Sequence, residues 1–143
     1  MRYIMTFNAD INEPQENKHP KGFTIAMLLS KRLNIYGIRT KEPENYNDIA
    51  WSVDCELNSK RFFFFVGYLG TKGTKWQLVI CSGGGILRRL LGYNDDQERF
   101  QVARSIHNIL SREDIVSEIK WFSKFTGSPH DKWFSEPPRI DYK

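Results

Sequence analysis

Asp54 and Glu56 are the two residues of this sequence best spaced for acid and base chemistry. They lie two positions apart in a stretch that alternates apolar and polar residues, so both side chains point to one face of a predicted strand. Two carboxylates in such positions can serve as a general acid and a general base. The same spacing is typical of a solvated strand face on which Arg61 is a charge partner, and we favour that interpretation.

A run of glycines in Ser82 to Gly85 precedes a short helical pattern, Ile86 to Leu91. Backbone amides ahead of a helix can surround a phosphate, and Arg88 and Arg89 would lie nearby. The segment lacks both the Lys-Ser/Thr ending of a nucleotide-binding loop and the third-glycine spacing of the dinucleotide fingerprint. We therefore interpret it as a flexible connection to a short helix that packs its leucines on the core.

The cysteines and histidines do not combine into a reactive site. The strand pattern places Cys55 and Cys81 on opposite faces, so we expect two small apolar side chains and no disulfide. None of the three histidines is close to either thiol in sequence, and His107 falls on the apolar face of a predicted helix. No cluster has the spacing of metal ligands. We predict a protein that is not an enzyme, with no catalytic residues, no metal and no cofactor.

Three apolar, aromatic-rich segments between Ile49 and Ser82 predict a β-meander that positions these residues. The first, Ile49 to Leu57, alternates strictly, and Asn58-Ser59 is a plausible two-residue turn. The second, Arg61 to Leu69, is apolar almost throughout, as expected of a central strand covered on both faces. The third runs from Trp76 to Cys81. The turn predicts the register Leu57 with Lys60, Glu56 with Arg61, Cys55 with Phe62, Val53 with Phe64 and Trp51 with Val66.

Other patterns predict the elements before the meander. A loose alternation in Met1 to Phe7 indicates a first strand. Three-to-four spacing of apolar residues after Pro20 indicates a helix that Gly37 ends. Ile38 to Thr40 fits a short edge strand, and the asparagines and Pro43 of residues 41–48 favour irregular chain.

The sequence after the meander predicts one further long helix. Apolar residues at helical spacing run from about Asp95 to Leu110, after capping side chains at Asn94 to Asp96. Residues 115–125 fit either a helix or a last strand, and both alternatives stay open. The tail from Thr126 to Lys143 is predicted to be irregular, yet it holds aromatics that usually dock on something.

The length and composition bound the kind of protein. A chain of 143 residues, 40% hydrophobic and 27% charged, is typical of one globular domain spanning residues 1–143. We predict an α+β fold with a central antiparallel meander packed by helices on one face. There is no apolar run long enough to span a membrane and no secretion leader, so we expect no membrane contact and a cytoplasmic location.

The second face of the meander is too apolar for bare solvent and too polar for a core. A mixed face of this kind needs a cover, which is the C-terminal tail, a second copy in a homodimer, or another protein. We predict that it is the partner-binding site, formed by Asp54, Glu56, Arg61, Phe63, Phe65 and Gln77.

A nucleic-acid partner is the alternative that the charge permits. The formal net charge is +4, and Lys60-Arg61, Lys72, Lys75 and Arg88-Arg89 are candidates for a basic rim. Aromatic side chains on a sheet can also stack on bases. However, basic and acidic residues are interspersed, and the phenylalanine run lacks the glycine-flanked consensus of RNA-recognition domains. We therefore rank a nucleic-acid or nucleotide-binding accessory protein second.

A set of core segments resembles small, poorly characterised bacterial α+β proteins. It consists of Gly22 to Leu33, Trp51 to Val53, Phe63 to Gly67, Trp76 to Leu78, Leu87 to Gly92, Ile106 to Leu110 and Ile119 to Trp121. In size and style the chain is similar to the immunity proteins encoded beside contact-dependent or secreted bacterial toxins.

This resemblance implies a cytoplasmic protein that neutralises a cognate toxin by direct binding. The shared segments are structural, so no binding residue is carried over from them. Immunity proteins of nucleases are often acidic, and the basic balance of this chain departs from that pattern. The departure suits a toxin with an acidic or mixed surface.

Overall fold

The fold is known from a computed structural model that describes residues 2–11, 21–69, 75–83 and 94–139. These residues form one seven-stranded antiparallel sheet and two α-helices, an α+β arrangement as predicted. The proposed helix start at Pro20, the glycines after Gly83 and the short helix at 86–91 lie outside the described residues.

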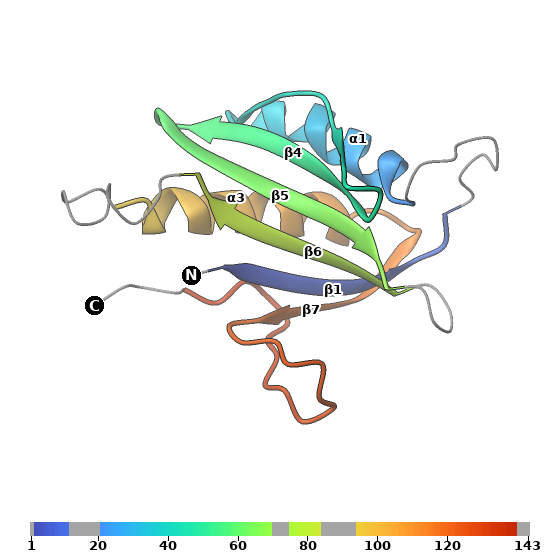
Figure 1. Cartoon of the computed structure of the whole chain (residues 1–143). Coiled ribbons are helices and arrows are strands. Elements are labelled where there is room, and N and C mark those ends of the chain that lie inside the picture. The colour runs from blue at the N-terminus through green and yellow to red at the C-terminus, as the bar shows by residue number, and fades with distance from the viewer. Residues whose placement is uncertain (1, 12–20, 70–74, 84–93, 140–143) are drawn as a thin grey trace.

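The meander forms the middle of the sheet, and the first and last strands extend it on one side (Figure 1). The strand order is β2-β4-β5-β6-β1-β7, and β3 also pairs with β4. The strands are β1 (Tyr3–Ala9), β2 (Arg39–Thr40), β3 (Glu44–Tyr46), β4 (Ala50–Leu57), β5 (Lys60–Tyr68), β6 (Lys75–Ser82) and β7 (Val116–Phe122).

The predicted hairpin is confirmed residue by residue. Asn58 and Ser59 have φ angles of 52° and 63°, the left-handed conformation that a tight two-residue hairpin turn requires. All five predicted pairs, including Glu56 with Arg61, occur in the β4–β5 register. The prediction for Ile49 is wrong, because this residue precedes β4 and is 68% exposed.

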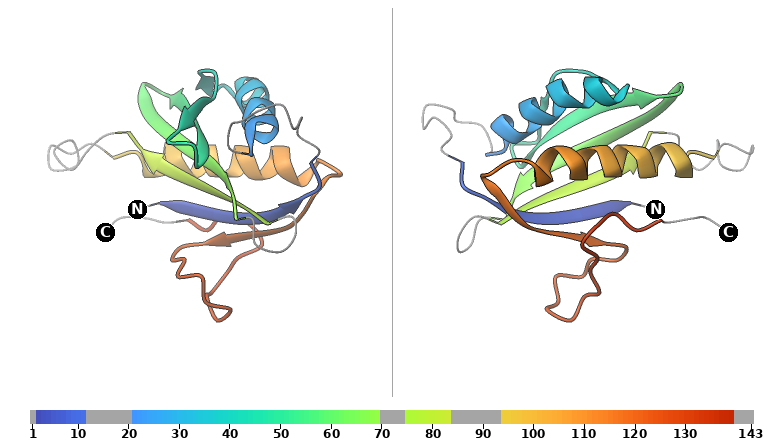
Figure 2. Two further views of the ribbon diagram at one scale, coloured as in Figure 1. Left: turned by 45° about the vertical axis from the view of Figure 1, so that its right-hand side comes forward. Right: turned by 180° about the vertical axis from the view of Figure 1, so that it is seen from behind.

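Both helices lie on one face of the sheet. Helix α1 (Phe23–Arg32) packs on β4 and continues into a 3-10 turn, Leu33–Tyr36, which Gly37 ends with a φ of 78°. Helix α3 (Asp96–Ser111) packs on β6 and β7. Figure 2 shows the two helices in front of the sheet when the molecule is seen from behind. No described helix covers the opposite face, so the expectation that β5 is covered on both faces is wrong.

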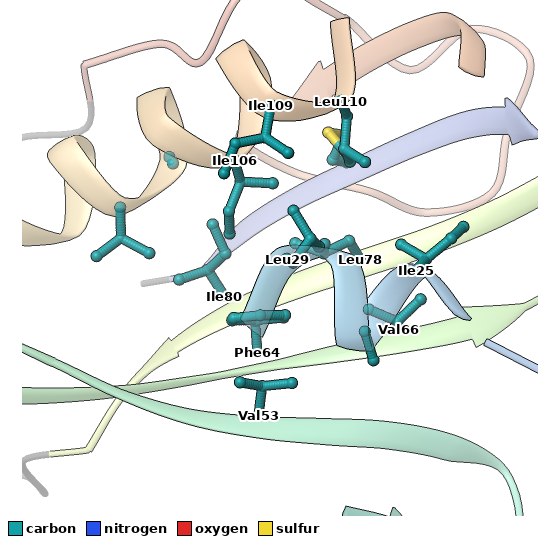
Figure 3. Packing of buried hydrophobic residues seen from close by; sticks show 14 of the residues in the cluster. Ile25, Leu29, Val53, Phe64, Val66, Leu78, Ile80, Ile106, Ile109 and Leu110 are labelled. Atoms are coloured by element: carbon teal, nitrogen blue, oxygen red, sulfur yellow. The ribbon is translucent and has the colours of Figure 1, made fainter. Parts of the chain in front are cut away.

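The core lies between the helices and this covered face of the sheet. Alternate residues of the meander, among them Phe64 and Leu78, meet Leu29 of α1 and Ile106 of α3 there (Figure 3). All four side chains are inaccessible to solvent. Burying an aliphatic or aromatic side chain of this size contributes about 1.5–3 kcal/mol, so this one-sided core stabilises the sheet and fixes which face is left open.

The structure corrects the prediction for one segment, decides between the two alternatives for another, and shows where the C-terminal tail lies. Residues 41–48 were expected to be irregular, but β3 forms within them because its backbone pairs with β4. Residues 115–125, left open between helix and strand, contain strand β7. The irregular tail contacts the edge of β7, where Phe134 and Trp121 exchange two backbone hydrogen bonds of 2.8 and 2.9 Å.

Of the capping side chains predicted at Asn94 to Asp96, that of Asn94 bonds a backbone N–H of the helix, whereas Asp95, the N-cap residue, makes no side-chain capping bond. The Asn94 side chain accepts a hydrogen bond of 2.9 Å from the backbone N–H of Asp96. Asp95 turns inward instead, and its carboxylate lies 3.0 Å from the guanidinium of Arg99, which is fully buried. Asp96 contacts the same guanidinium at 2.6 Å. Asp95 and Asp96, predicted only to cap the helix, therefore form ion pairs with the buried Arg99.

Candidate functional site

The open face of the sheet carries the predicted partner-binding residues. It points toward the viewer in Figure 1, with both helices behind it. Its side chains are partly accessible or, at Asp54 and Arg61, exposed, which fits the mixed composition noted in the sequence. They include Thr6 on β1, Ser52, Asp54 and Glu56 on β4, Arg61, Phe63 and Phe65 on β5, and Gln77, Val79 and Cys81 on β6.

The pairing of β2 with β4 and β5 sets the charged residues in two adjacent rows. One row consists of Arg39, Glu56 and Arg61, which are direct partners across three strands. The next row places Asp54 beside Phe63. Lys41, the residue after β2, lies beside Asp54 in the same row, because its backbone N–H donates to the carbonyl of Asp54 at 2.9 Å. The acidic residues thus lie on β4, and the basic residues lie on β2, just after β2 and on β5.

A pocket of about 310 Å³ opens among these rows. Its lining includes four of the six predicted site residues, Asp54, Glu56, Arg61 and Phe63. It also includes Arg39, Thr40, Lys41, Cys55, Phe62 and Gly83. The sequence analysis missed Arg39 and Lys41, since only the pairing of β2 with β4 brings them to this place.

The charged side chains of the pocket do not neutralise one another by direct contact. Among the residues that the structure describes, Arg39, Lys41, Asp54, Glu56 and Arg61 make no ion pair within 4.0 Å. Glu56 is therefore opposite Arg61 in register, as predicted, without being bonded to it. No ion pair between described residues has to break when these groups contact another molecule.

Aromatic rings continue the site beyond the pocket. The rings of Phe63 and Phe65 are 5.3 Å apart and nearly perpendicular, and Tyr46 of β3 lies 4.7 Å from Phe65. Tyr46 is 44% exposed. We call Phe63, Phe65 and Tyr46 the aromatic row. These contacts, one edge-to-face and one tilted, join the three rings into one apolar surface.

Two predicted features lie away from this cluster. Gln77 is on the same face but pairs with Gly67, two rows beyond the row of Phe63 and Cys81. Lys60 does not join Arg61 in a basic rim, because it points to the opposite face and contacts Glu98 of α3 at 3.0 Å. Lys72, Arg88 and Arg89 of that rim lie outside the described residues.

The C-terminal aromatics do not cover the aromatic row. Phe134 packs at the edge of β7, as its hydrogen bonds to Trp121 require. The following chain reaches the helix side, where the Tyr3 hydroxyl donates to the Pro138 carbonyl at 2.7 Å. Trp133 is 51% exposed and lies 5.1 Å from the Lys120 ammonium. The described part of the tail therefore leaves the pocket and the aromatic row open.

The two thiols differ in environment. Burial, followed by the neighbouring charge of Asp54, raises the pKa of Cys55 to about 12, so this thiol is a poor nucleophile. Burial also raises the pKa of Cys81, while Arg2 opposes that shift. Cys55 points into the core and Cys81 lies on the open face opposite Phe63, as predicted.

His107 is a structural residue of the helix side. Its Nδ1 accepts a hydrogen bond of 3.0 Å from Trp121 Nε1. Burial lowers its pKa, the carboxylate of Glu136 opposes this effect and Arg104 adds to it. The imidazole is thus held neutral as an acceptor.

Searches against protein-family models, curated proteins and solved structures found no match. The described helices include none that is long and apolar enough to cross a membrane. In the same part of the chain, no group of three or more His, Cys, Asp or Glu side chains is arranged to hold a metal ion. The candidate site is therefore defined by its own geometry, as a charged pocket that adjoins an aromatic row.

Proposed function

We propose that this chain is a non-catalytic protein-binding protein whose partner docks on the open face of the sheet. The observation that carries the proposal is the continuity of the aromatic row with the charged pocket on a face that no described helix covers. Central aromatic anchors bordered by charged residues are typical of the parts of protein interfaces that dominate affinity.

The most concrete form of this proposal is an immunity protein that neutralises a cognate toxin in the cytoplasm. Blocking a toxin needs surface complementarity rather than catalysis, and the pocket offers charges of both signs beside an apolar surface. The similarity of the chain in size and style to bacterial immunity proteins favours the same conclusion. A mixed-charge face suits a partner whose own surface is mixed or acidic.

Photo-crosslinking from the open face in the native host tests the location and the class of the partner. A benzoylphenylalanine at position 65 should capture one protein in a defined ratio. The same group at position 35, where Ile35 is 82% exposed on the helix side, should not capture it. Capture of a second copy of the chain would favour a homodimer, and recovery of nucleic acid would favour the accessory-protein alternative.

Binding and growth measurements then test neutralisation. The captured protein should arrest growth when it is expressed alone in a heterologous host, and co-expression of this chain should restore growth. Arg61→Glu should abolish both rescue and binding, because it reverses one of three cations in the pocket. Arg112→Glu, an exposed change at the end of α3, is the matched control and should rescue normally. Equal rescue by both variants would contradict the proposed site.

A further inference from the structure

The charge balance of the pocket indicates the kind of group that it binds. Among the lining residues that the structure describes, three side chains are basic, Arg39, Lys41 and Arg61, and two are acidic, Asp54 and Glu56. One positive charge is therefore left over. A group with a single negative charge balances these five side chains, and an added cation does not.

The basic groups converge from two sides of β4. Arg39 and Lys41 come from β2 and the residue after it, and Arg61 comes from β5. Because none of the three makes an ion pair among the described residues, an incoming anion does not have to break one. A guanidinium binds a carboxylate through two parallel N–H···O bonds, which favours a carboxylate over a spherical anion.

The rest of the lining limits the size and shape of that group. The half-buried ring of Phe63 forms an apolar wall that continues to Phe65 at 5.3 Å. A volume of about 310 Å³ is at the low end for ligand pockets, and it suits one or two side chains rather than a large cofactor.

We propose that the pocket holds the carboxylate of an Asp or Glu side chain of the protein partner, next to an apolar partner residue that packs on Phe63 and Phe65. This inference rests on the proposed protein-binding function and names the chemistry of the partner's central contact. The guanidinium groups of Arg39 and Arg61 and the ammonium of Lys41, offset by Asp54 and Glu56, supply the one net positive charge that balances this carboxylate.

NMR titration of the full-length chain with capped dipeptides tests the proposal. The probes are acetyl-Phe-Glu-amide, its uncharged counterpart acetyl-Phe-Gln-amide and its reversed counterpart acetyl-Phe-Lys-amide. The Glu peptide should shift the side-chain N–H signals of Arg39 and Arg61 and saturate with a dissociation constant on the order of 1 mM. The Gln and Lys peptides should bind at least about tenfold more weakly. Equal shifts from all three peptides would overturn the proposal.

Substitutions on the protein side give the reciprocal test. Arg61→Gln and Arg39→Gln should each weaken binding of the Glu peptide about tenfold and leave thermal unfolding unchanged, since neither side chain has an ion pair with a described residue to lose. Arg112→Gln, on the helix side, is the matched control and should bind like the wild type. Unchanged affinity in both pocket variants would overturn the assignment of the cations.

The combined outcomes separate this inference from the proposed function. If position 65 captures a protein but the Glu peptide does not bind, the partner docks on the open face without a central carboxylate and only this inference fails. If the Glu peptide binds but no protein is captured, the pocket binds a free small carboxylate. The proposed protein-binding function then fails, and so does the claim that the carboxylate belongs to a protein partner.

Discussion

Gly83 and Arg61 are in direct backbone contact at the rim of the pocket. The N–H of Gly83 donates to the carbonyl of Arg61 at 2.8 Å, which extends the β5–β6 pairing by one residue. A Cβ at position 83 would lie 3.0 Å from both the Cβ and the carbonyl oxygen of Arg61. A side chain at position 83 would therefore push on the backbone of Arg61, which would have to move by a few tenths of an ångström.

Gly83→Ala should disturb the pocket through Arg61. The added methyl group meets backbone that must shift, so we expect a loss of about 1–3 kcal/mol in the free energy of unfolding. Binding of the acidic dipeptide should weaken as well. Gly67→Ala is the matched control on β5, because its Cβ would have ordinary contacts of 3.6 Å or more. Urea unfolding measures the stability of Gly83→Ala and Gly67→Ala. Equal stability of the two variants would contradict the close contact between position 83 and Arg61.

Arg99→Met should destabilise the protein strongly. The change leaves the carboxylate of Asp95, which is 3% exposed, buried without its guanidinium partner at 3.0 Å. Loss of one partner from a buried ion pair costs about 3–5 kcal/mol. Arg104→Met, at an exposed position of the same helix, should stay within about 0.5 kcal/mol of the wild type. Urea unfolding at neutral pH measures both. A loss in Arg99→Met no larger than in the control would mean that the pair contributes little.

The meander was predictable because two independent patterns agree. The alternation of Trp51, Val53 and Cys55 fixes the buried face, and the Asn58-Ser59 turn fixes the register to β5. Shifting either strand by one residue would expose the apolar set, so no competing register fits the sequence.

The complete pocket was not predictable, because it depends on contacts between distant elements. Arg39 enters through β2, a strand of two residues that is too short to show periodicity. Tyr46 lies in a segment whose asparagines favour a loop, and pairing with β4 overrides that preference. Arg99 shows only an i, i+4 relation to Asp95, which is common on exposed helices, and nothing local indicates that the pair is buried.

The stability of the protein should fall in mild acid through His107. Its pKa is lowered in the folded state, chiefly by burial, so the unfolded chain binds a proton more readily. The free energy of unfolding therefore decreases as the pH falls through the unfolded pKa of about 6.5 and continues to fall until the folded pKa is passed. Protonation would also break the acceptor bond to Trp121.

His107→Gln should flatten that pH dependence. Glutamine can still accept the hydrogen bond of Trp121 but does not titrate. Unfolding free energies at pH 7.5 and 5.5 should differ less in this variant than in the wild type. His130→Gln, at an exposed position, is the control and should keep the full difference. If the unfolding free energy of His107→Gln changed between pH 7.5 and 5.5 as much as that of the wild type, the acid sensitivity would come from other groups.

Cys81 should react with thiol reagents in the folded protein while Cys55 does not. Raising the pKa of Cys55 from 9.0 to about 12 makes its thiolate about a thousandfold rarer at pH 8, and the side chain is also buried. A disulfide-exchange reagent should therefore modify one thiol per chain, and Cys81→Ser should remove that reaction. Reaction of both thiols at one rate would contradict their placement on opposite faces.

Modification of Cys81 should also report on the open face. Cys81 is the direct cross-strand neighbour of Phe63, so an anionic aromatic adduct there brings bulk and negative charge to the edge of the pocket. Binding of the acidic dipeptide should weaken by about tenfold or more, because the adduct competes for the same cations. Cys81→Ser treated with the same reagent should bind normally. Undiminished binding by the modified wild type would show that the carboxylate site does not extend toward β6.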